Sequence, residues 1–96
     1  MSYRVILSPD AEEDIRAAIR WYLQKQLELS FRFRAEVQTV LRRVAQNPFQ
    51  FPLNPTLIRK ALLRRFPYAI YFTLNAEGAL VLAISHQRRV TTWNEP

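Results

Sequence analysis

The chain has 96 residues, a hydrophobic content of 49% and a formal net charge of +6. A chain of this length forms one domain, residues 1–96, with one compact core. It contains no cysteine and a single histidine, which excludes disulfides and thiolate metal sites and argues against a structural zinc site. We therefore expect no cofactor and no metal.

The net positive charge is higher in the C-terminal part of the chain, because acids are rare there. From Pro55 onward the sequence has six Lys or Arg residues against two acids, Glu77 and Glu95. Such a surface attracts nucleic acid, the ribosome or an acidic protein, although charge alone is equally compatible with a basic surface that has no single partner. The N-terminus lacks a signal peptide, and no apolar run is long enough to span a bilayer. We expect a cytoplasmic protein that makes no membrane contact.

A short strand followed by a helix is predicted at the N-terminus. Residues 3–7 are rich in apolar and β-branched side chains, and Ser8 and Pro9 fit a helix cap and a first helical turn. Four acids follow at the start of this helix: Asp10, Glu12, Glu13 and Asp14. They resemble a metal or catalytic cluster, but negative charge at the positive end of the helix dipole explains them.

Two apolar stripes at helical spacing cover residues 11–22, with Ile15, and residues 29–44, with Val40. Periodicity alone allows one helix of more than about thirty residues, which is too long for a domain of this size. We therefore predict a helical hairpin that bends near residues 25–30. Residues 47–55 contain three prolines, which end the second helix and form an irregular connection.

Three strands are predicted in the second half of the chain, at residues 57–66, 68–75 and 79–86. The last two are joined by Asn75–Gly78, in which the only glycine of the chain fits a turn position with positive φ. Residues 80–84 are apolar on both faces and are predicted to form a central strand. The predicted fold is α+β, with an N-terminal strand and a helical hairpin packed on an antiparallel sheet in the order β-α-α-β-β-β.

Six short motifs, together with this order of elements, resemble the RelE/ParE family of bacterial toxins from type II toxin–antitoxin pairs. The resemblance covers nearly the whole chain. The motifs are Ala11-x-x-Asp14-Ile15, Trp21-Tyr22, Asn47-Pro48, Arg59, Phe66-Pro67-Tyr68-x-Ile70-x-Phe72, and His86-x-x-Arg89 with Trp93.

The resemblance implies one of two activities, because the family has two branches. RelE-like members cut mRNA in the ribosomal A site without a metal, whereas ParE-like members inhibit DNA gyrase. Lys60 matches one basic position of the RelE-like set, and Arg88 or Arg89 matches the C-terminal arginine. Leu62 and Ala69 stand where RelE-like enzymes carry basic residues, and the place of the catalytic tyrosine falls near Trp93-Asn94.

This depleted set favours the ParE-like branch, a stoichiometric gyrase inhibitor rather than an enzyme. The first alternative is a RelE-like endoribonuclease, whose candidate catalytic residues would be Lys60, Arg64, His86 and Arg88. His86 could serve as a general base at neutral pH, but a structural role at the end of a strand is the more common one. The second alternative is an inactive toxin fold that is kept as a binding module.

All of these alternatives share a cognate antitoxin as partner, in a toxin–antitoxin hetero-oligomer. Family antitoxins commonly wrap the toxin with an extended segment that folds on binding. We expect acids on that segment to complement Arg59, Lys60, Arg64 and Arg65, and its apolar side chains to cover the helices. The full set of predicted target- or antitoxin-binding residues is Arg59, Lys60, Arg64, Arg65, Arg88, Arg89 and Trp93.

Overall fold

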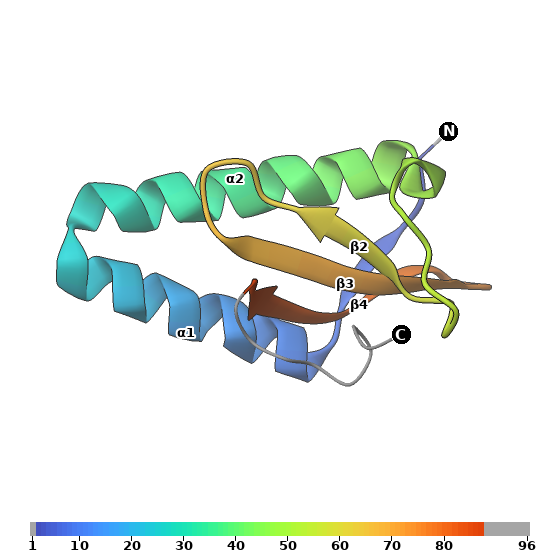
Figure 1. The fold of residues 1–96 in the computed structure, drawn as a ribbon, viewed down its shortest axis with the longest axis horizontal. Helices are drawn as coiled ribbons and strands as arrows, with labels where there is room; N and C mark the ends of the chain where they lie inside the picture. The colour runs from blue at the N-terminus through green and yellow to red at the C-terminus, as the bar shows by residue number, and fades with distance from the viewer. Residues whose placement is uncertain (1, 88–96) are drawn as a thin grey trace.

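A computed structural model describes residues 2–87 of the chain. Its elements follow the predicted order, with two helices between the first strand and the other three (Figure 1). They are β1 (Val5–Leu7), α1 (Pro9–Lys25), α2 (Leu27–Gln46), a short 3-10 helix at Pro48–Gln50, β2 (Arg59–Leu62), β3 (Tyr68–Asn75) and β4 (Gly78–His86). The predicted α+β fold is thereby confirmed.

The four strands form one sheet in the order β1-β4-β3-β2. Strands β2, β3 and β4 pair antiparallel, as predicted, whereas β1 pairs parallel with β4, so the complete sheet is mixed. The chain between β1 and β4 contains both helices and then β2 and β3, so this parallel pairing joins segments that are far apart in the sequence. Strand β4 lies between β1 and β3, which confirms the prediction of a central strand at residues 80–84.

The helical hairpin bends within the predicted range. Gln26 is the last cap of α1 and the first cap of α2, and its extended backbone (φ −165°) interrupts the helical path. At the start of α1 the Ser8 hydroxyl accepts a hydrogen bond from the Ala11 backbone N–H at 3.0 Å, with Pro9 as the first helical residue. These contacts confirm the predicted cap and first turn.

The core lies between the helical hairpin and one face of the sheet. Phe33 of α2 is at its centre, with ring centroids 5.3 Å from both Tyr22 and Phe66 and 5.1 Å from Tyr68. Val40 is 2% exposed and belongs to this core, whereas Ile15 is only partly buried at its margin.

The turn between β3 and β4 needs its glycine, as predicted. The Asn75 side chain accepts hydrogen bonds from the backbone N–H groups of Glu77 and Gly78, at 2.9 and 3.1 Å. Gly78 has φ +137°, and a Cβ there would lie 2.2 Å from the backbone oxygen of Arg4. That oxygen accepts a hydrogen bond from Ala79 N–H at 2.7 Å, so the close approach ties β1 to the start of β4.

Two strands are shorter than the sequence predicted. Residues 3–7 give only Val5–Leu7, and residues 57–66 give only Arg59–Leu62. The second strand ends early because the Glu36 carboxylate of α2 accepts hydrogen bonds from the backbone N–H groups of both Arg64 and Arg65. In a strand, two successive N–H groups would point to opposite sides. Residues 63–67 therefore form a turn, and we call this segment the basic turn.

Candidate functional site

The basic residues of β2 do not share one environment. The Arg59 guanidinium donates a hydrogen bond to the Phe51 backbone oxygen at 2.8 Å and lies 5.2 Å from the Phe49 ring centroid. It therefore anchors the loop after α2, in addition to any binding role. The Lys60 ammonium lies 6.0 Å from the Tyr71 ring centroid, and Tyr71 is its cross-strand partner.

Arg64 and Arg65 are exposed on the basic turn, where α2 approaches the end of β2. Their backbone N–H groups both donate to Glu36 Oε2, the one from Arg65 at 2.9 Å. Within residues 2–87 their guanidinium groups form no salt bridge, in contrast to Arg16, Arg20 and Arg32, which are paired with glutamates.

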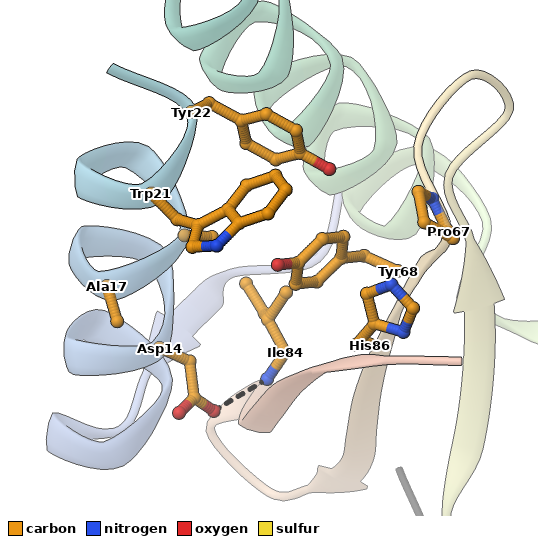
Figure 2. Close-up of a pocket in the computed structure, with 9 residues that line it drawn as sticks. Asp14, Ala17, Trp21, Tyr22, Pro67, Tyr68, Ile84 and His86 are labelled. Atoms are coloured by element: carbon orange, nitrogen blue, oxygen red, sulfur yellow. Dashed lines mark hydrogen bonds between the residues drawn. The ribbon is translucent and has the colours of Figure 1, made fainter. Parts of the chain in front are cut away.

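An aromatic pocket of about 720 Å³ lies between α1 and the ends of β3 and β4 (Figure 2). Its α1 wall has two alanines that leave space beside the larger aromatic rings. The lining residues are Asp14, Ala17, Ala18, Trp21, Tyr22, Pro67, Tyr68, Ile84 and His86. Trp21 is 52% exposed at the pocket, so about half of its surface is open to solvent or to a partner.

His86 is part of this pocket through its position at the end of β4. It pairs with Tyr68 of β3, and the two rings meet edge to face with centroids 5.2 Å apart. Tyr22 lies on the opposite wall, and its burial, with a smaller effect from Tyr68, raises the pKa of its hydroxyl. The Tyr22 hydroxyl is therefore neutral at physiological pH.

Asp14 connects the two walls of the pocket. Its carboxylate accepts a hydrogen bond from the backbone N–H of Ile84 at 2.9 Å, shown as the dashed line in Figure 2. Strand β1 pairs with β4 only as far as Val81, so Asp14 supplies an acceptor on the side of β4 that β1 no longer covers. The sequence had suggested only a helix-start role for this acid, and the contact with β4 was missed.

Two of the predicted ribonuclease residues, Lys60 and His86, are not brought together. Ala61 and Ile84 face the helices as part of the core. Because side chains alternate along a strand, Lys60 lies on the opposite face, while His86 lies on the same face as Ile84. Lys60 and His86 therefore lie on different faces of the sheet. Arg88, Arg89 and Trp93 lie outside the described residues.

Residues 2–87 contain neither a candidate metal site nor a candidate membrane span. No group of three or more His, Cys, Asp or Glu side chains in this range could hold a metal ion. None of the helices in the same range is long and apolar enough to cross a membrane.

The fold is similar to that of a chain from a solved toxin–antitoxin system. Ten chains of known structure match, and one of them is from the chromosomal ParDE TA system of P. aeruginosa. It has a TM-score of 0.77 and 17% sequence identity, and the match covers 88% of this chain and 95% of that one. At this identity the likeness concerns the fold alone.

The sequence itself identifies the family. Residues 5–91 match the family model described as the ParE toxin of the type II toxin–antitoxin system parDE. The chain therefore belongs to the ParE toxin family. No curated protein matches the sequence.

Proposed function

We propose that this ParE-family toxin acts in the cytoplasm as a stoichiometric inhibitor of DNA gyrase. The observation that carries the proposal is the separation of Lys60 from His86 by the sheet. Metal-independent cleavage of RNA needs a base for the ribose hydroxyl and cations at the same phosphate. A histidine on the helix side and a lysine on the other side do not supply them together, so binding of a target protein is the better supported activity.

A purified-component assay tests this proposal. Increasing amounts of the toxin are added to DNA gyrase and relaxed plasmid, and the supercoiled product is measured. We expect supercoiling to fall in proportion to the ratio of toxin to gyrase, as a stoichiometric inhibitor requires. Undiminished supercoiling at large molar excess of toxin, with protein that arrests growth when expressed, would contradict the proposal.

A parallel assay distinguishes the ribonuclease alternative. Primer extension on a ribosome-bound message is expected to give no new stops after the toxin is added. Discrete cuts in the A site that disappear in His86→Ala would instead make the protein an endoribonuclease. The matched control is Trp21→Phe, which alters the same pocket at a residue that carries no acid–base group.

We also propose that an antitoxin neutralises the toxin in a hetero-oligomer, with acidic residues near the basic turn. The support is the pair of exposed guanidinium groups on Arg64 and Arg65, which lack salt bridges within residues 2–87. Reversing both to Glu is expected to slow association more than it weakens final affinity, because exposed charges act mainly on the encounter. The rate constants of toxin–antitoxin binding measure this difference.

A further inference from the structure

The basic turn has the geometry of an anion-binding site. Two successive backbone N–H groups, from Arg64 and Arg65, point to one carboxylate oxygen. Successive N–H groups that converge in this way form a concave site for anions. The two exposed guanidinium groups of the same residues add positive charge around it, so the turn is built to hold a negative group.

The negative group in this structure belongs to the chain itself. Glu36 projects from the middle of α2, 28 residues before Arg64 in the sequence, and is partly buried. Its carboxylate takes the position that an external anion would occupy. Any carboxylate from a partner must therefore replace Glu36 or share the turn with it, and sharing places two like charges close together.

The surroundings of the turn favour an acidic peptide over a nucleic acid. The Lys60 backbone N–H donates to the Pro52 oxygen at 3.2 Å, on the edge of β2 away from β3. Leu62, two residues later, directs its backbone groups to that same edge, and its side chain is 52% exposed. An extended peptide can pair beside Leu62, cover its side chain and deliver a carboxylate to the turn. A phosphodiester chain lacks the alternating N–H and C=O groups with which a peptide pairs at a strand edge.

We propose that Glu36 is an internal ligand that fills the anion site of the free toxin, and that a carboxylate on an extended acidic segment of a partner protein displaces it. Assigning that segment to the antitoxin rests on the proposed function. The site itself does not, because its ligand chemistry follows from the turn. Glu36 thus sets how tightly an acidic segment is held.

Peptide binding to three forms of the toxin tests the exchange. The probe is a fluorescently labelled peptide of six glutamates, and its dissociation constant is measured by anisotropy at low ionic strength for wild type, Glu36→Gln and Glu28→Gln. Glu28 lies on the same helix and pairs with Arg32, so its removal changes the net charge equally and also frees one arginine. We expect Glu36→Gln to bind about fivefold more tightly, the scale of one exposed charge contact, and Glu28→Gln to change less than about twofold.

Three results would overturn the proposal. Equal tightening in both variants would mean that net charge alone acts, and no peptide binding to any form would mean that the turn is not a site for carboxylates. If Glu36→Gln also bound a single-stranded DNA of the same charge more tightly, and by the same factor, the turn would be assigned to nucleic acid. Each result is independent of gyrase inhibition, so the proposed function can fail while this inference stands.

A measurement on the unaltered toxin covers the case in which Glu36→Gln does not fold. The backbone amide proton resonances of Arg64 and Arg65 are followed by NMR while the peptide is added. Exchange of one carboxylate for another is expected to shift both resonances, with the Glu36 side chain moving in the same titration. Amides of the basic turn that stay unchanged while peptide binds elsewhere would overturn the proposal.

Discussion

Replacing Asp14 by alanine separates two roles for an acid near the start of α1. Asp14 lies beyond the first turn of α1, which holds Asp10 and Glu12. If it acted only on the helix dipole, its loss would cost less than the about 0.3–1 kcal/mol of a first-turn acid. The structure shows instead that its carboxylate holds the N–H of Ile84, a residue that is 2% exposed. A buried N–H without an acceptor costs about 1–3 kcal/mol. We expect Asp14→Ala to lower the free energy of unfolding by about 2 kcal/mol.

The assay is urea unfolding at neutral pH, followed by far-UV circular dichroism, for wild type, Asp14→Ala, Asp14→Asn and Asp10→Ala. Asp10 lies in the first turn of α1 and is exposed, so its variant measures the dipole effect alone. Asp14→Asn keeps an oxygen acceptor and is expected to lose about half as much as Asp14→Ala. Equal losses for Asp14→Ala and Asp10→Ala would refute the role of the contact with β4.

Three other predictions concern the core, the turn and pH. Gly78→Ala is expected to cost at least about 3 kcal/mol, because its Cβ meets the Arg4 oxygen at positive φ, whereas the exposed neighbour variant Glu77→Ala should change the unfolding free energy by less than about 0.5 kcal/mol. Val40→Ala is expected to cost about 2–4 kcal/mol, more than Ile15→Ala at the core margin, in the same urea assay. The pKa of Tyr22 is raised above its usual 10.0. The stability that the neutral Tyr22 hydroxyl contributes is therefore complete below the usual pKa and is lost as the pH rises through the raised pKa. Thermal unfolding from neutral pH to about pH 11 should therefore show a smaller alkaline loss for Tyr22→Phe.

The fold was largely predictable because its signals are local. The caps at Ser8 and Pro9, the apolar stripes of both helices and the glycine of the β3–β4 turn each act within a few residues of chain. Apolar character on both faces was sufficient to place residues 80–84 inside the sheet. The parallel pairing of β1 with β4 was not predicted, because the β1 strand has only three residues and carries no pattern that selects its neighbour.

The candidate site was less predictable because its contacts are distant in sequence. Asp14 and Ile84 are 70 residues apart, and Glu36 and Arg64 are 28 apart. In both pairs the acid bonds to a backbone N–H, which every residue except proline possesses. The type of the residue that donates the N–H therefore gives no signal of the contact in the sequence. The family motifs named Tyr22, Tyr68 and His86 separately, but only the fold joins them in one pocket.

The contact of Glu36 with the backbone helps to explain why the surface just after β2 is basic. The chain has eight acidic residues against fourteen Lys and Arg, and its two long-range carboxylate contacts within residues 2–87 are made by Asp14 and Glu36 to backbone groups rather than to arginines. The Glu36 contact lies just after β2, and Arg64 and Arg65 beside it form no salt bridge within residues 2–87. The same acid that shapes the basic turn thus leaves Arg64 and Arg65 available for a partner. A protein that neutralises this surface has to supply the missing carboxylates, and the one it places at the turn has to compete with Glu36.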